Sequence, residues 1–159
     1  MPNLDINTPL GQRSLADERE AIAIFHRHHP GCYFVETPKD QPAAIDGMIE
    51  RDGVTRAIVE VKARSFTLEQ FQITHGSQWL ITASKIDKAA EIADALCVPL
   101  WGFLYLVNSK VLLTQQLHHR GRQITSISRR HSVTQATING GSANRLNAYV
   151  DMREARILR

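Results

Sequence analysis

Residues 58–64 read IVEVKAR, and this stretch decides how the chain can fold. The run is rich in β-branched and apolar residues, as is typical of a strand that is buried on both faces. Glu60 and Lys62 interrupt it, and because side chains alternate along a strand, both project from the same face. Burying a carboxylate and an ammonium costs free energy unless another group compensates them. We therefore expect a binding or catalytic site on this face of the strand.

The composition is that of an ordinary globular domain. The 159 residues are enough for one domain with a sizeable core, and 43% of them are apolar and 22% charged. No apolar run approaches the roughly 18 residues of a membrane helix, and the N-terminus shows no secretory signal pattern. Cys32 and Cys97 lie far apart, which indicates neither a CxxC metal knuckle nor a disulfide framework. A reducing, cytoplasmic setting is the default expectation.

Positive charge is concentrated near the C-terminus. Residues 1–117 contain 11 Lys and Arg against 14 Asp and Glu, whereas residues 118–159 contain 8 Arg against 2 acids. This basic segment suits an anionic partner, nucleic acid first, although a solvated arginine surface explains the charge equally well. The candidate nucleic-acid contacts in it are Arg120, Arg122, Arg129, Arg130, Asn144 and Arg145.

Periodicity and turn signals predict a mixed α/β domain. The expected elements are a loose arm over 1–13, a helix from Ser14 to Pro30, strands at 32–37, 43–50 and 54–64, a short helix at 67–74, an extended piece at 79–82, a helix from Ser84 to Pro99, and strands at 100–107 and 110–115. Two or three short strands, a Gly140-Gly141 turn and a helical piece from Asp151 should follow. The order predicts a mixed central sheet flanked by helices, in one domain over 14–159 with a core at 14–117 and a β-rich extension at 118–159.

The register of the predicted hairpin decides whether a second acid joins Glu60. A plain two-residue turn pairs Asp46 with Val59 and puts Asp46 and Glu60 on opposite faces. A three-residue loop with a left-handed Gly53 in a G1 bulge pairs Asp46 with Ile58 instead and puts both carboxylates on one face. We prefer the bulged register because it makes a site.

Asp46 and Glu60 on neighbouring strands would form a hard-oxygen site. Mg²⁺ is usually held by one or two carboxylates, with positions left for water and phosphate. Lys62 lies one pleat along from Glu60, where its ammonium could hold a water or stabilise charge on a phosphate. These groups are the minimum set of side chains that metal-assisted hydrolysis of a phosphodiester requires.

The spacing D-x13-E-V-K, on the second and third strands after an N-terminal helix, resembles the PD-(D/E)XK nuclease superfamily over roughly residues 14–107. The resemblance implies a restriction-endonuclease-like αβββαβ core. It also implies that Asp46, Glu60 and the carbonyl of Val61 bind Mg²⁺, for which Mn²⁺ could substitute, and that Lys62 is the catalytic lysine. The chain departs from the family pattern at one position, since Ile45 and not proline precedes Asp46.

Two helical residues could complete such a site. The family often adds a glutamate from its first helix, and Glu18 lies on the apolar stripe there, whereas Glu20 is the alternative on another face. Either could instead be a solvated acid in the first turns. Lys85 lies on the apolar stripe of the second helix, and its charge opposes the helix dipole. A role at the acidic cluster or at a phosphate is favoured slightly over a lysine that snorkels at the core's edge.

The small size of the chain is most similar to archaeal-type Holliday junction resolvases and phage-encoded nucleases. This likeness implies a metal-dependent deoxyribonuclease in DNA recombination or repair that acts as a homodimer, with a helicase or recombination partner for any processive role. The alternatives are a module of the same fold that binds nucleic acid without cutting, and an RNA-directed or structural subunit. The substrate (junction, flap, end or specific site) stays open, as does the choice between endonuclease and exonuclease.

Two weaker signals point away from other kinds of site. None of the seven histidines is paired with Cys or acidic residues at the spacing of a zinc site. Trp79 and Trp101 are expected in the core more than on a base-stacking surface.

Overall fold

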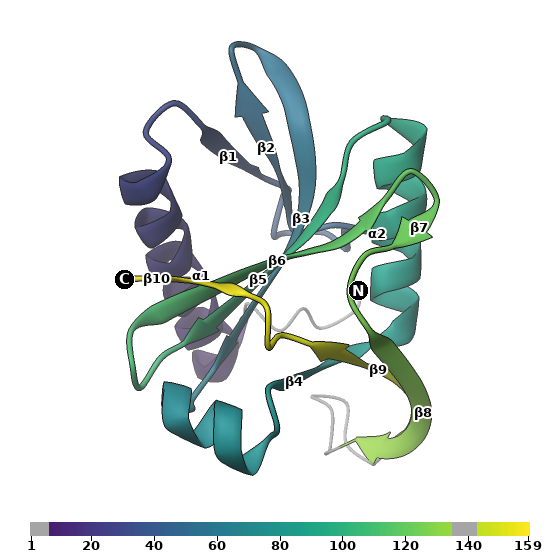
Figure 1. Cartoon of the computed structure of the whole chain (residues 1–159). Coiled ribbons are helices and arrows are strands. Elements are labelled where there is room, and N and C mark those ends of the chain that lie inside the picture. The colour runs from purple at the N-terminus through teal and green to yellow at the C-terminus, as the bar shows by residue number, and fades with distance from the viewer. Residues whose placement is uncertain (1–6, 135–142) are drawn as a thin grey trace.

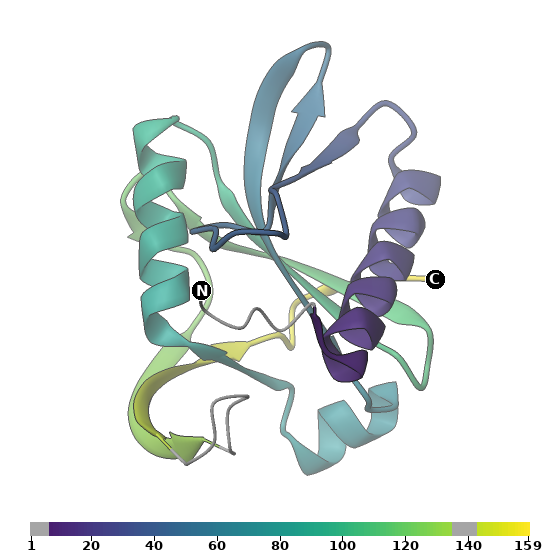
Figure 2. The same ribbon diagram turned by 180° about the vertical axis from the view of Figure 1, so that it is seen from behind.

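The computed structural model describes residues 7–134 and 143–159. In this part of the chain, a seven-stranded sheet separates two helices (Figure 1), and the view from behind shows one helix on either side of it (Figure 2). The helices are α1 (Pro9–His28) and α2 (Ala83–Ala95), with a short π-helix, η2 (Gln70–Thr74). The strands of the sheet, in spatial order, are β1 (Tyr33–Glu36), β2 (Gly47–Arg51), β3 (Val54–Arg64), β5 (Leu100–Leu106), β6 (Val111–His119) and β10 (Arg156–Leu158), and β7 (Arg122–Gln123) also pairs with β6.

The sheet is mixed, because β3 and β5 run parallel whereas the other neighbours run antiparallel. A second sheet has β9 (Ala143–Asp151) between β4 (Gln78–Thr82) and β8 (Ile127–Thr134). The predicted mixed α/β class is confirmed. The described part of the chain contains no helix that is both long and apolar enough to cross a membrane.

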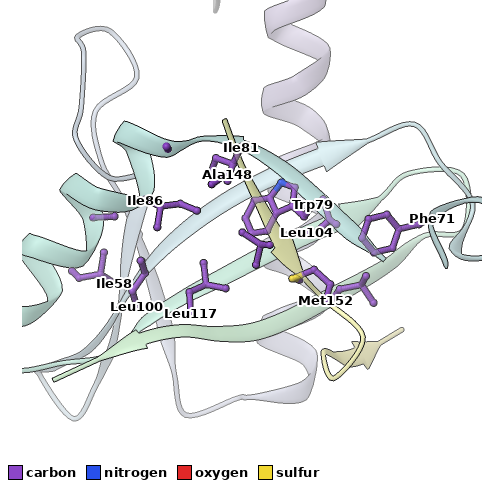
Figure 3. Packing of buried hydrophobic residues seen from close by; sticks show 14 of the residues in the cluster. Ile58, Phe71, Trp79, Ile81, Ile86, Leu100, Leu104, Leu117, Ala148 and Met152 are labelled. Atoms are coloured by element: carbon purple, nitrogen blue, oxygen red, sulfur yellow. The ribbon is translucent and has the colours of Figure 1, made fainter. Parts of the chain in front are cut away.

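Alternation along β3 divides the core into two clusters. Ile58 packs toward α2 and the second sheet, whereas Val59 and Val61 pack toward α1. Figure 3 shows the first cluster, in which Trp79 lies over the central sheet. Trp79 is 1% exposed, as expected of a core residue. The face of β3 that carries Ile58 also carries Glu60, so the buried acid belongs to the α2 side of the sheet.

Helix α1 begins earlier than predicted. Thr8 is its N-cap, and the Thr8 hydroxyl accepts a 3.0 Å hydrogen bond from the Gly11 amide. Pro9 occupies the first helical position, where its missing N–H costs nothing. The Thr-Pro signal therefore outweighs the one at Ser14, and residues 9–13 are helix rather than arm. Residues 1–6 lie outside the described residues.

The turn of the β2–β3 hairpin differs from the predicted three-residue loop. Arg51 pairs with Val54, which leaves a two-residue turn. Asp52 and Gly53 both have positive φ, 53° and 72°. This is the mirror-image turn that an Asp-Gly pair favours because it matches the strand twist. The predicted left-handed Gly53 is confirmed, but the three-residue loop was wrong.

A register shift occurs inside β3 instead, in the direction opposite to the predicted one, and the predicted pairing of Asp46 with Ile58 was wrong because Ile58 pairs with Met48. Arg56 has no partner on β2 and forms a bulge. Beyond the bulge Gly47 pairs with Val59, so Asp46, which directly precedes β2, comes level with Glu60. Asp46 and Glu60 therefore share a face, as predicted, although the residue that brings this about was not foreseen.

The C-terminal region holds longer strands than predicted. β8 has 8 residues and β9 has 9, and they form one antiparallel ribbon. The piece after Asp151 contains the strand β10 and not a helix, because Arg156–Leu158 pair antiparallel with β6, and Leu158 is buried against the α1 side. β9 pairs with β4, and β10 with β6, so the extension is tied into the core. The expected Gly140-Gly141 turn lies outside the described residues.

Candidate functional site

Three carboxylates from three elements form one electrostatic cluster. Glu18 comes from α1, Asp46 from the residue before β2, and Glu60 from β3. Glu18 is 9% exposed and Glu60 is 1% exposed. Asp46 is close enough to raise the pKa of both. The fold thus brings together the acids that the sequence marked as candidates.

Glu60 is a buried carboxylate with only half of its hydrogen-bonding capacity used. Its Oε1 lies 3.3 Å from the Nζ of Lys85, whereas its Oε2 is buried and has no partner among the described residues. Burial, and then the charge of Asp46, raise the pKa of Glu60 to about 7, although Lys85 and Lys62 act in the opposite direction. An orphaned carboxylate oxygen at this depth is the feature that a bound cation would satisfy.

Hydrogen bonds fix both the side chain and the carbonyl group of Asp46. Its Oδ2 accepts a 2.8 Å hydrogen bond from the amide of Val61, and its carbonyl accepts 3.0 Å bonds from the amide and the hydroxyl of Thr37. The N–H and C=O of one strand residue point to the same edge, so the Val61 carbonyl also faces the Asp46 side. β2 begins only at Gly47, which leaves this stretch of the β3 edge without a paired strand.

The two predicted lysines approach the cluster from different elements. Lys85 comes from the first turn of α2. Burial disfavours its charge, but Glu60 and Asp46 outweigh this and raise its pKa, so the ammonium stays charged. Lys62 lies on β3 and has no carboxylate within ion-pair distance in the described chain. Among the nearby charges, Lys62 has the largest effect on the pKa of Glu18, and it lowers that pKa.

The structure separates the two candidate glutamates of α1. Burial raises the pKa of Glu18, which lies in the cluster. Glu20 is exposed, and its Oε2 accepts a 2.6 Å hydrogen bond from the hydroxyl of Tyr105. Burial and this bond raise the pKa of Tyr105. The bond joins α1 to β5. Glu18 is therefore positioned for the site, and Glu20 has a structural partner.

Sequence reasoning missed two cations of this region. Lys39 lies between two acids, with its Nζ 3.8 Å from Glu18 Oε2 and 3.9 Å from Asp46 Oδ1. It sits in a segment that reads as a turn, which gives no signal of a site. Arg64 continues the period-two row of Glu60 and Lys62, so spacing could have found it. Its guanidinium donates to the Leu80 carbonyl of β4 at 3.3 Å, and burial lowers its pKa.

The predicted basic residues are divided between surfaces. Arg129 forms two hydrogen bonds of 3.0 and 2.8 Å to the carboxylate of Asp87 on α2, so its charge is already balanced. Arg130 projects from the other face of β8, where its guanidinium lies 3.8 Å from the centroid of the Tyr149 ring. By strand alternation Arg145 shares the face of Arg130, and Asn144 shares that of Arg129.

Arg120 and Arg122 lie elsewhere, at the turn between β6 and β7. Asp94 of α2 holds this turn, because it pairs with His118 at 2.8 Å and accepts the Gly121 amide at 3.0 Å. These two arginines therefore do not extend the surface around Arg130.

Among residues 7–134 and 143–159, no three His, Cys, Asp or Glu side chains come together as a metal-binding group. The side chains at the site offer a pair, Asp46 and Glu60, and the remaining protein oxygen is the Val61 carbonyl. Mg²⁺ keeps several waters and commonly uses one or two carboxylates, so a pair is sufficient for it but not for zinc.

No family model matches the chain, and neither a curated protein nor a solved structure is significantly similar to it. The chemistry of the site therefore has to carry the functional assignment.

Proposed function

We propose that the protein is a Mg²⁺-dependent nuclease that hydrolyses phosphodiester bonds in DNA. The observation that carries the proposal is the environment of Glu60. A carboxylate that is 1% exposed, has an oxygen without a partner in the described part of the chain and lies level with a second carboxylate, Asp46, is costly for a purely structural role. A divalent cation and an anionic substrate would compensate both charges.

The residues present fit such a cation. Asp46, Glu60 and the Val61 carbonyl would hold Mg²⁺ or Mn²⁺ through hard oxygen atoms, and the unpartnered Oε2 of Glu60 is free for this role. Bound there, the cation would polarise a phosphate oxygen and make a coordinated water more acidic. Glu18 is the further acid that could align water at the same site.

The lysines then have separable tasks. Lys62 carries a compact positive charge without an ion-pair partner in the described chain, which suits it to stabilise charge on a reacting phosphate or to orient a water. Lys85 is committed to Glu60, and its side chain is still 43% exposed. We assign to it the positioning of the buried carboxylate and of a neighbouring phosphate.

The order of the elements supports the PD-(D/E)XK reading. α1 is followed by the three strands β1, β2 and β3 and, after η2 and β4, by α2 and β5, and β5 lies parallel to β3. The proposed ligands occupy the second and third of these strands or directly precede them. We therefore propose an αβββαβ core with an added β-ribbon.

The nucleic acid would cross from β3 to the second sheet. Arg64 is the last charged residue on this face of β3, and it donates a hydrogen bond to Leu80 of β4. β4 in turn pairs with β9, the strand that carries Tyr149 and Arg145. Arg130 stacks on Tyr149, and no carboxylate of the described residues lies within ion-pair distance of it. A stacked guanidinium presents its N–H edge to a phosphate, so this face suits backbone contacts.

A second candidate is a module that binds nucleic acid without cutting it. The observation that favours it is Lys39, whose ammonium lies within 4 Å of Asp46 and Glu18 and partly neutralises them. Incubation with Mg²⁺ and a panel of branched, linear and single-stranded DNAs decides between the two. Cleavage that Asp46→Asn abolishes supports the nuclease, and binding without cleavage supports the module.

A further inference from the structure

Lys39 lies in the cluster but has no role in the proposed hydrolysis. Its Nζ is 3.8 Å from Glu18 and 3.9 Å from Asp46, and its side chain is 24% exposed. Both distances are too long for hydrogen bonds, so the attraction is ionic. Asp46 is one of the proposed metal ligands, and the same negative charge cannot fully serve the ammonium and a divalent cation at once.

The segment around Lys39 is built so that the lysine can leave while Asp46 stays. Residues 37–46 have no regular secondary structure. The ends of the segment are fastened by Thr37, whose hydroxyl donates to the carbonyls of Ile45 and Asp46 at 2.7 and 3.0 Å. Lys39 lies within the loop that these bonds close, and its side chain is held by the two ion pairs. Displacing its side chain therefore breaks no hydrogen bond of the described structure.

Lys39 is one of four cations whose charges act on the three carboxylates, and the others are Lys62, Lys85 and Arg64. A divalent cation beside Asp46 would add two positive charges to this partly buried place, and the excess would repel the nearby ammonium of Lys39. A phosphate of the nucleic acid removes the excess, and a displaced ammonium is a suitable partner for it.

We propose that Lys39 competes with the divalent cation for Asp46 and Glu18, and that a phosphate of bound nucleic acid draws its ammonium away. This inference rests on the proposed function. It makes metal binding and nucleic-acid binding cooperative, and by linkage each must strengthen the other by the same factor. The free protein then holds its metal weakly, and the site is completed when substrate arrives.

The test measures Mn²⁺ binding to the DNA-free protein by the electron paramagnetic resonance signal of free Mn²⁺. Lys39→Met should bind Mn²⁺ about tenfold more tightly than the wild type, the scale expected for the loss of two ion pairs to one competing cation. Lys88→Met removes a charge from an exposed position of α2 and should change the affinity by less than about twofold. A short DNA duplex should tighten Mn²⁺ binding to the wild type more than to Lys39→Met.

A second measurement separates displacement from a general charge effect. In the wild type, the side-chain ¹⁵N signal of Lys39 should move toward that of an exposed lysine as Mg²⁺ is added, whereas the Lys88 signal should not change. A Lys39 signal that is unaffected by saturating Mg²⁺ overturns the competition.

The outcomes also distinguish this inference from the proposed function. If Lys39→Met binds Mn²⁺ no better than the wild type, while Asp46→Asn abolishes binding, Lys39 does not compete and the metal site stands. If the wild type and Lys39→Met bind Mn²⁺ no better than Asp46→Asn does, both the competition and the metal site are wrong.

Discussion

Lys85 reaches from the first turn of α2 to the buried carboxylate of Glu60 on β3, with Nζ 3.3 Å from Oε1, while Oε2 of the same carboxylate has no hydrogen-bond partner among residues 7–134 and 143–159. Lys85 compensates one oxygen of the Glu60 carboxylate, and no described residue compensates the other oxygen. The protein therefore keeps a group that burdens its own stability, which is typical of functional sites.

The first prediction concerns stability and pH in the absence of metal. The pKa of Glu60 is raised from 4.5 to about 7, so the folded state binds a proton more tightly than the unfolded state. The contribution of Glu60 to stability is therefore most favourable at low pH and is lost as the pH rises from 4.5 through about 7. Glu60→Gln, which imitates the protonated acid, should raise the free energy of unfolding at pH 8 by up to about 3 kcal/mol.

The same substitution should have little effect near pH 5, where wild-type Glu60 is largely protonated. Urea denaturation in EDTA at both pH values measures the difference. An equal effect at pH 5 and pH 8, or a loss of stability at pH 8, would show that Glu60 does not carry this burden.

The second prediction concerns the chemical step. Lys62→Met should lower the single-turnover rate of cleavage at saturating enzyme by about a hundredfold or more, with little change in DNA affinity. Lys62→Arg should not restore the rate, because a planar guanidinium does not replace a compact ammonium. Quench-flow or gel assays supply the rates. Full activity of the arginine variant would argue against a role in the reaction centre.

Lys85 should behave differently in the same assay. Its ammonium pairs with Glu60 and is 43% exposed, so Lys85→Met should weaken DNA binding and slow cleavage by a smaller factor than Lys62→Met does. A loss as severe as that of Lys62→Met would place Lys85 in the reaction centre. A silent variant would mean that the lysine merely covers the edge of the core.

The third prediction separates two adjacent arginines. Arg130→Ala should reduce the slope of log affinity against log salt by about one unit for each lost phosphate contact. Arg129→Ala is the matched control, and it should leave the slope unchanged because Asp87 already balances its charge. Fluorescence anisotropy with labelled DNA over a range of salt concentrations measures both slopes. Equal slopes for the two variants would remove Arg130 from the DNA surface.

The fourth prediction concerns the packing of Trp79 and Leu117 against Gly102, which pairs with Glu60 across β3 and β5. A Cβ at Gly102 would lie 2.5 Å from the Trp79 ring and 3.0 Å from Leu117, so Gly102→Ala should cost about 1–3 kcal/mol. At Gly31 a Cβ would meet only the Arg51 side chain, at 3.9 Å, and Gly31→Ala should change stability by less than about 0.5 kcal/mol. Urea denaturation compares the two. A neutral Gly102→Ala would mean that Trp79 can shift.

The common face of Glu60 and Lys62 could be predicted from sequence because strand alternation depends on nothing beyond the strand. The position of Asp46 required a register, and registers depend on bulges. The bulge falls at Arg56, an exposed residue within a run of good strand formers, where no residue type marks it. The Asp52-Gly53 pair favours a two-residue turn, so the extra residue of the hairpin lies in β3 and not in the turn.

Other features were hidden for different reasons. Thr8 and Pro9 form a recognisable helix start, and the Ser14 signal, which predicts a later start, is weaker than theirs. Lys39 enters the site through tertiary folding of an irregular segment, which no periodicity reports. The strand after Asp151 forms because β6 offers it an edge, and that edge is not visible from the local sequence.

The most direct test of the central claim is cleavage of a panel of DNA substrates by the wild type, Asp46→Asn and Glu60→Gln, with Mg²⁺ and with EDTA. The wild type should cut at least one substrate only with Mg²⁺, and both variants should lose cleavage while still binding DNA, because each removes a proposed metal ligand and also reduces repulsion of phosphate. Undiminished Mg²⁺-dependent cleavage by Asp46→Asn, or DNA binding by the wild type without cleavage of any substrate, would contradict the proposed nuclease.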